Sequence, residues 1–340
     1  MTDRPPHQRE TVTGRAGLEA ELRRAVAGAA ISNGWIIAGP KGAGKATLAY
    51  RLARAILDPE ALTDASSLQM SAKARSFRLI AQNAHPDLFV AQRRHDEKND
   101  RYETEISVET ARALTSFLSK TAAGGGWRVA IVDAADDLNR NAANALLKSL
   151  EEPPAKTALL LLAHAPGRLL ATIRSRCRRI ALRPVPDAEI AALLCEEAGA
   201  DPETAGALAR AARGRPGYAL TLAAGEGEEA VAAAGEFFSK AVASGDVGAV
   251  AASLAGKAAL GRWEIFQELV LEQLSDAARA QARGRTPSGP LAALSAPVLF
   301  DAHQRLAALL RRGEAVNIDR RDLVLAMGRG LHAFARDAAA

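Results

Sequence analysis

A glycine-rich segment near the N-terminus constrains the fold of this chain more than any other feature. Residues 34–47 read GWIIAGPKGAGKAT, in which a short apolar run is followed by glycines and then by a helical pattern. Strand, glycine loop and helix in this order are typical of a phosphate-binding loop, or P-loop. Glycines let several backbone N–H groups point inward, while a lysine and a helix N-terminus add positive charge. The segment predicts a nucleotide-type α/β domain with Gly39, Gly42, Gly44 and Lys45 in the loop.

The residue after Lys45 departs from that motif. A hydroxyl normally follows the lysine and binds Mg²⁺, but this chain has Ala46. Thr47 comes one residue later and points about 100° away on a helix, so it cannot simply take over the role. We expect a degenerate nucleotide site that has lost its metal ligand, with Thr47 among the residues next to the nucleotide. A glycine turn without chemical meaning is the alternative, and nucleotide binding stays open.

A second strand ends in a carboxylate. Residues 127–133 read WRVAIVD, a buried strand closing on Asp133. A carboxylate at the C-terminal edge of such a strand lies where ligands of open α/β sheets bind. In an active ATPase a glutamate would follow and orient the attacking water, but this chain has Ala134. Ala46 and Ala134 together predict an ATPase fold that no longer hydrolyses ATP. In the alternative interpretation, Asp133 only caps the next turn.

Length and composition bound the remaining possibilities. The chain has 340 residues, 48% of them hydrophobic, which suits about two or three helix-rich domains. The net charge of +5 permits contact with nucleic acid without arguing for it. Two cysteines, Cys177 and Cys195, exclude a disulfide framework and fit a reducing cytoplasm. Residues 1–10 are polar and expected to be disordered, and no apolar run is long enough for a membrane. We expect a cytoplasmic protein.

Strand and helix patterns alternate through the first half of the chain. Further strands are expected at 88–91, 157–163 and 178–182, and helices at 11–31, 46–57, 108–118 after an N-cap at Ser107, 139–150 and 168–173. Such alternation indicates a parallel sheet covered on both faces. The charged segment 92–105 is expected to be an exposed loop or hairpin. After Pro184-Val185-Pro186, residues 187–224 are expected to form three short helices, and every segment from Glu226 onward reads as helix. The predicted domains are 1–183, 184–225 and 226–340.

Three sequence blocks carry a family resemblance. They are GPKGAGKATLA, VAIVDAADDLNRNAANALLKSLEEPP and LLLLAHAPGRLLATIRSRCRRIAL. In order and spacing they resemble the delta-prime family of bacterial DNA polymerase III clamp-loader subunits. The resemblance covers Thr11 to about Leu220, and beyond that it depends on length and helical character. It implies an AAA+ RecA-like P-loop sheet domain, then a small helical lid and an all-α collar.

The resemblance also assigns roles to single residues. In the family, the triplet Ser175-Arg176-Cys177 carries an arginine finger, so Arg176 would reach the γ-phosphate bound by a neighbouring subunit. A guanidinium suits this task because it stays charged and donates in a planar fork. The alternative is a solvated basic cluster. Cys177 is not expected to act as a nucleophile, since no histidine lies in a recognisable partner motif.

Two more residues fall where the family places sensors of the phosphate, His164 after the third long strand and Arg215 in the lid. For His164, a hydrogen-bonded turn histidine is an equal alternative. Many relatives carry a four-cysteine zinc module, but residues 58–126 contain no cysteine. His85 and His95 cannot make a tetrahedral site alone, so no zinc is expected.

The implied function is that of a loader subunit that helps to place a sliding clamp on primed DNA. Its implied partners are gamma/tau-type subunits that hydrolyse ATP, a delta-type subunit that opens the clamp, the clamp itself and primer–template DNA. No cofactor would be required, and weak ATP or ADP binding stays open. The alternatives are an active gamma/tau-type ATPase, which needs both missing residues, and an unrelated P-loop kinase or NTPase.

Overall fold

The computed structural model describes residues 4–28, 31–93, 95–96, 101–103, 105–123, 125–316 and 318–339. The chain forms two compact units, Met1–Leu193 with Ala212–Ala219, and Leu194–Ala211 with Leu220–Ala340. This grouping does not test the three predicted domains, which stay a prediction.

The first unit is built on a parallel sheet. Its strands lie in the order β2 (Leu88–Gln92), β5 (Arg128–Asp133), β6 (Thr157–Ala163), β1 (Gly34–Ala38) and β7 (Arg178–Ala181). Every residue of β1 and β6 is buried. Strands of a covered parallel sheet must be apolar at successive positions, which explains the continuous apolar runs in the sequence. The predicted α/β P-loop fold is confirmed, with the strand ends placed to within a residue.

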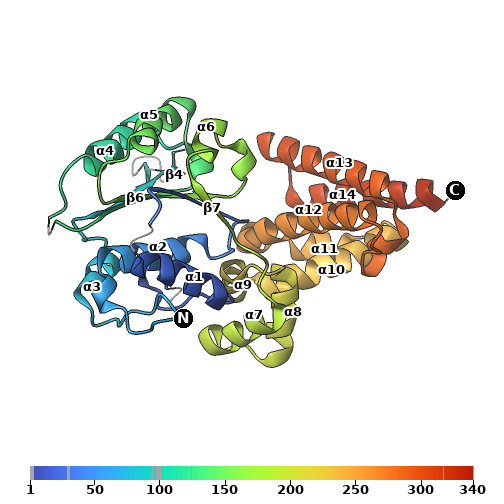
Figure 1. Ribbon diagram of the computed structural model, residues 1–340. Coiled ribbons are helices and arrows are strands. Elements are labelled where there is room, and N and C mark those ends of the chain that lie inside the picture. The colour runs from blue at the N-terminus through green and yellow to red at the C-terminus, as the bar shows by residue number, and fades with distance from the viewer. Residues whose placement is uncertain are drawn as a thin grey trace. The chain divides into compact units, whose positions relative to one another are not determined.

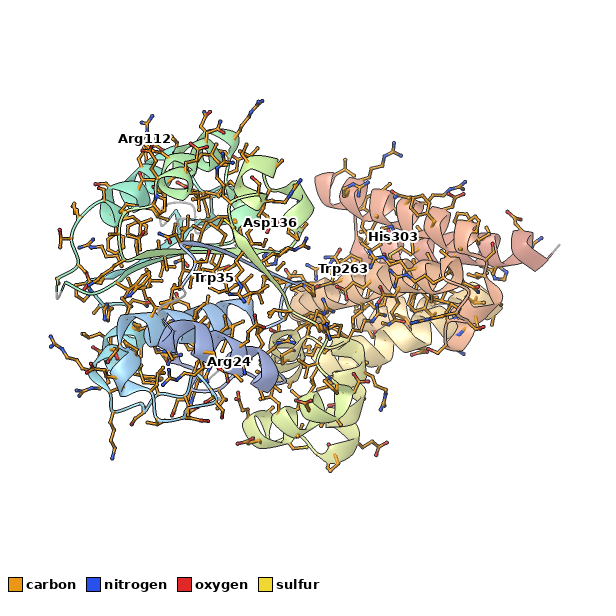
Figure 2. All side chains as sticks on the ribbon, viewed as in Figure 1. Arg24, Trp35, Arg112, Asp136, Trp263 and His303 are labelled. Carbon is orange, nitrogen blue, oxygen red and sulfur yellow. The ribbon has the colours of Figure 1, made fainter. Side chains whose placement is uncertain are left out.

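Helices cover both faces of this sheet (Figure 1). One face carries α1 (Ala16–Ala27), α2 (Lys45–Leu57) and α3 (Arg75–Ala81), and the other carries α4 (Val108–Leu118), α5 (Arg140–Glu151) and α6 (Ala171–Arg174). Alternate residues of β1 pack against opposite helix layers. Trp35, labelled in Figure 2, and Ile37 lie in the core on the side of α1, α2 and α3. Ile36 and Ala38 lie in the core on the side of α4, α5 and α6. This is the two-residue period of a strand.

Short helices and caps complete the unit. The short helices are η1 (Pro6–Gln8), η2 (Pro59–Ala61), η3 (Ala135–Asp137), η4 (Pro166–Arg168) and α7 (Asp187–Leu193). The predicted N-cap is confirmed, since the Ser107 hydroxyl accepts a hydrogen bond from the Thr110 N–H at 3.3 Å. Helix α3 was not predicted because its seven residues are too few to show a helical period. Helix α1 is shorter than the predicted 11–31.

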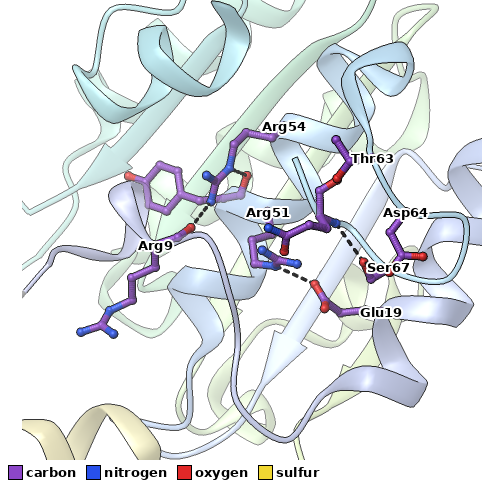
Figure 3. A network of polar contacts seen from close by, with 9 residues as sticks. Arg9, Glu19, Arg51, Arg54, Thr63, Asp64 and Ser67 are labelled. Carbon is purple, nitrogen blue, oxygen red and sulfur yellow. Dashed lines mark hydrogen bonds and ion pairs between the residues drawn. The ribbon is translucent and has the colours of Figure 1, made fainter. Parts of the chain in front are cut away.

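The expectation of a disordered N-terminus is wrong for residues 4–10. The Arg54 guanidinium of α2 donates to the Arg9 carbonyl at 2.6 Å (Figure 3), and the rings of His7 and Tyr50 lie 5.7 Å apart. One turn earlier in α2, the Arg51 Nε donates to Glu19 Oε1 of α1 at 2.6 Å, and both side chains are buried. A buried cation needs such partners. The two arginines of α2 therefore order the polar segment and fix α1.

The charged segment 92–105 lies partly outside the described residues. Where it is described, β3 (His95–Asp96) pairs with β4 (Arg101–Tyr102) in antiparallel fashion, with His95 opposite Tyr102. The predicted hairpin is thus confirmed by its two strands.

The described residues from 194 onward are helical, as predicted. They form η5 (Leu194–Ala198), α8 (Pro202–Ala212), α9 (Pro216–Ala224), α10 (Gly227–Ala243), α11 (Gly248–Ser253), η6 (Lys257–Ala259), α12 (Leu260–Ala282), η7 (Gly289–Ala293), α13 (Ala296–Ala315) and α14 (Arg320–Ala339). In the second unit the ring of Phe266 packs edge-on against Phe237 and stacks with Trp263. No helix in the described part of the chain is long and apolar enough to cross a membrane.

Candidate functional site

The glycine-rich loop lies between β1 and α2, as predicted. Gly42 and Gly44 have φ angles of 79° and 88°. Residues other than glycine adopt this left-handed region only at a cost in free energy. The Gly39 N–H donates to the Ala163 carbonyl at 3.1 Å, which anchors the loop to the end of β6. The positive φ angles explain the glycines at positions 42 and 44 by backbone geometry.

The Lys45 ammonium turns back onto its own loop. Its Nζ donates to the carbonyls of Gly39 at 2.7 Å and Pro40 at 2.8 Å, and lies 2.8 Å from His164 Nδ1. The residue is only 5% exposed. Burial lowers the pKa of Lys45 to about 8, although Asp133 and Asp136 oppose the shift. In this conformation the ammonium faces three acceptors, two in the loop and one on His164.

His164 is the natural acceptor for one of these N–H groups. Burial, and then the charge of Lys45, lower the pKa of His164, while nearby carboxylates oppose the shift. A neutral ring with an unprotonated Nδ1 can accept from the ammonium. His164 therefore does reach the P-loop, at the position that the sequence indicated, and it holds the lysine there.

Asp136 is a site residue that the sequence reasoning missed (Figure 2). Its carboxylate accepts hydrogen bonds from the backbone N–H groups of His164 at 2.5 Å and Ala165 at 2.8 Å. It therefore fixes the turn after β6 that presents His164 to Lys45. The one available signal was its place three residues after Asp133, at the same edge of the sheet. Burial raises the pKa of Asp133 against the opposing charge of Lys45.

The start of α9 contacts the other side of the loop, within the first unit. The Gly217 N–H donates to the Gly42 carbonyl at 2.8 Å. A Cβ atom on Gly42 would lie 2.6 Å from the backbone nitrogen of Tyr218. Arg215 is 5% exposed, with its Nε on the Ala212 carbonyl at 2.9 Å and its guanidinium 4.1 Å from the centre of the Tyr218 ring. The predicted sensor arginine thus lies near the loop and supports the residues that touch it.

Arg15 is a second residue that the sequence did not reveal. Its guanidinium is 6% exposed and donates to the carbonyls of Arg183 at 2.5 Å and Ala43 at 3.1 Å. Burial lowers the pKa of Arg15, while Glu189 opposes the shift. The guanidinium links the P-loop to the segment after β7. No motif surrounds it, so only the folded chain identifies it.

The two predicted losses lie in the same site. Ala46 occupies the first turn of α2, where a hydroxyl would face the loop, and Ala134 follows the last residue of β5. Thr47 is on α2 with 8% exposure. The Lys45 ammonium contacts loop carbonyls, and the residue after it has no hydroxyl to offer Mg²⁺.

Arg176 lies far from this loop. Its carbonyl is 3.4 Å from a Cβ built on Gly34, the first residue of β1, whereas the P-loop follows the last residue of β1. At about 3.3 Å per residue the five residues of β1 separate the two ends by about 13 Å. The Arg176 guanidinium pairs with Glu151 at 2.9 Å. The structure does not bring this predicted residue together with the others.

Cys177 is packed rather than reactive. A Cβ on Gly34 would lie 2.8 Å from its Sγ, and burial raises the pKa of the Cys177 thiol to about 11. At neutral pH such a thiol is almost wholly protonated. No group of three or more His, Cys, Asp or Glu side chains in the described ranges is arranged to hold a metal. The absence of zinc stays a prediction.

Known proteins resemble this chain over its first half. Residues 15–186 match the model of a family described as DNA polymerase III, delta subunit. The subunit delta' of DNA polymerase III from Pseudomonas aeruginosa is 39% identical over 157 residues, which are 46% of this chain and 44% of that protein. The Escherichia coli K12 subunit delta' is 34% identical over 200 residues, 59% of this chain and 58% of that protein. The chain thus spans about half the length of these curated relatives.

A further relative has a different name. The DNA polymerase III subunit tau of Escherichia coli K12 is 37% identical over 131 residues, which are 36% of this chain and 20% of that protein.

Proposed function

The chain belongs to the delta-prime family of DNA polymerase III clamp-loader subunits, and we propose that it is a loader subunit that does not itself hydrolyse ATP. In this role it completes a ring of subunits that places the sliding clamp on primed DNA. Its own P-loop is a remnant that requires no cofactor. Its contribution to ATP hydrolysis is the Arg176 side chain, offered to the site of a neighbour.

The Lys45 ammonium is the observation that carries this proposal. A P-loop lysine serves catalysis by donating to the phosphates, but here its Nζ donates to Gly39 and Pro40 and contacts His164. Gly217 and Tyr218 lie against Gly42 on the other side of the loop. A phosphate bound by Lys45 would have to displace the contacts of its Nζ with Gly39, Pro40 and His164, and Ala46 could still give the metal no hydroxyl ligand.

The position of Arg176 supports its action in trans. It stands at the opposite end of β1 from the P-loop and is 35% exposed in its side chain. An exposed arginine at that edge can reach a partner but not the loop of its own chain without rearrangement of the sheet. A guanidinium supplied in trans to a developing phosphoryl charge is worth about 10³-fold or more in rate.

The partners follow from the family. We expect gamma/tau-type subunits with working ATP sites and a delta-type subunit in the same assembly, with the clamp and primer–template DNA handled by the complex. The collar formed by residues 226–340 would join the subunits. The isolated chain should bind DNA weakly and with salt dependence.

A steady-state ATPase assay tests the proposal. The chain alone should be silent. The loader is then rebuilt with its partners, clamp and primed DNA. With Arg176→Ala it should lose the ATP turnover of the one neighbouring site that receives this arginine, while Arg174→Ala serves as the matched control. Mg²⁺-dependent turnover by the isolated chain, abolished by Lys45→Ala, would refute the proposal. That outcome would favour the alternative, an active gamma/tau-type ATPase, toward which the likeness to tau points.

A further inference from the structure

The Arg176 guanidinium is held by its own chain on both terminal nitrogens. One Nη donates to the carbonyl of Thr172 at 3.0 Å and lies 3.3 Å from the Ser175 hydroxyl. The other lies 2.9 Å from Oε1 of Glu151. A phosphate gripped by an arginine normally takes two parallel N–H groups of the same fork. The chain's own acceptors therefore already contact both Nη atoms, which a phosphate held by this fork would also use.

Packing brings Glu151 and Arg176 together. A Cβ on Gly34 would lie 2.8 Å from Leu150 Cδ2 and 2.8 Å from Cys177 Sγ. The residue before Glu151 and the residue after Arg176 thus lie against the same glycine. Glu151 is also the last residue of α5, which Pro153 prevents from continuing. The buried Leu150, the half-buried Cys177 and a fixed helix end place the carboxylate beside the guanidinium.

We propose that Glu151 is an internal competitor for the arginine finger: it holds Arg176 in the free subunit and yields it to the phosphate of a neighbouring ATP site. The proposal depends on the role given to Arg176 above. The side chains of Arg176 and Glu151 are 35% and 48% exposed, so water screens the pair and it is weak. A weak pair suits this task, because it neutralises the arginine yet gives way to a phosphate that carries more charge.

The isolated chain provides the first test, which does not depend on ATP hydrolysis. Phenylglyoxal modifies accessible arginines, and mass spectrometry gives the rate at Arg176. Glu151→Gln should raise that rate about two- to fivefold at low salt, the range set by exposed ion pairs, and the increase should shrink as salt screens the wild-type pair. Glu152→Gln removes the same charge one residue further and should leave the rate unchanged. Equal rates in all three proteins would overturn the proposal.

The rebuilt loader gives the second test. Glu151→Gln should lower the ATP concentration for half-maximal turnover about two- to fivefold, Glu152→Gln should not, and Glu151→Gln should have no effect in an Arg176→Ala background. If Arg176→Ala slows the loader but Glu151→Gln does not differ from Glu152→Gln, Glu151 does not compete. If Arg176→Ala itself changes nothing, the trans role fails and the competition loses its target.

Discussion

Replacing Gly42 by alanine should loosen the contact between the P-loop and the start of α9. Two costs add at this position. The φ of 79° is unfavourable for alanine by about 1–2 kcal/mol. The new Cβ would also lie 2.6 Å from the Tyr218 nitrogen and 2.7 Å from its Cβ, and relieving such overpacking costs about 1–3 kcal/mol. Together they lower the free energy of unfolding by about 2–5 kcal/mol.

Gly44→Ala is the matched control. Gly44 has a φ of 88°, so alanine there meets a similar backbone cost, but its Cβ would approach only Val12 Cγ2 at 3.6 Å. The control should therefore lose about 1–2 kcal/mol. The difference between the two variants isolates the contact with Gly217 and Tyr218.

Urea unfolding and amide hydrogen exchange measure the two effects. The Gly42→Ala protein should unfold at a lower urea concentration than Gly44→Ala, with an unchanged slope. Exchange of the amides at residues 213–219 should accelerate in Gly42→Ala and stay near the wild-type rate in Gly44→Ala. Identical midpoints and identical exchange in the two variants would show that α9 does not rest on the loop in solution.

Three further predictions concern buried groups. Glu19→Ala should lower the free energy of unfolding by about 3–5 kcal/mol in urea titrations, because it leaves the buried Arg51 charge without its carboxylate; a loss below about 1 kcal/mol would contradict the burial of this pair. Iodoacetamide at pH 8 should label the exposed Cys195 far faster than Cys177, whose thiolate fraction is about 10⁻³ with a pKa of about 11; comparable rates would refute its packing. Lys45 has a pKa of about 8 when folded and 10.5 when unfolded, so between these values only the unfolded chain keeps the proton and stability should rise with pH. Lys45→Met should lack this rise, and parallel urea midpoints of the two proteins from pH 7 to 10 would argue against the shift.

The sheet and the P-loop could be predicted from the amino-acid sequence. Short continuous apolar runs such as 157–163 are typical of strands covered on both faces, and the left-handed backbone at Gly42 and Gly44 is a local property of the loop. The sequence also revealed that Ala46 replaces the hydroxyl residue and Ala134 the glutamate of an active site, because each position of a motif is read directly from the chain. The N-terminal residues 4–10 were misjudged because their order depends on Arg54, which lies 45 residues from Arg9.

The contacts that close the site could not be predicted from the sequence. The Lys45–His164 contact joins residues 119 positions apart, and the Arg15–Arg183 hydrogen bond spans 168 positions. Neither leaves a local pattern, because partners so distant in sequence are chosen by the crossing of strands and not by spacing. The pairing of Glu151 with Arg176 was equally hidden in the sequence. The sequence shows Gly34 only as the start of a strand, whereas in the fold Leu150 and Cys177 pack against it and bring Glu151 to Arg176. Short-range periodicity in the sequence determines the helices and strands, whereas contacts between distant side chains form only in the folded chain.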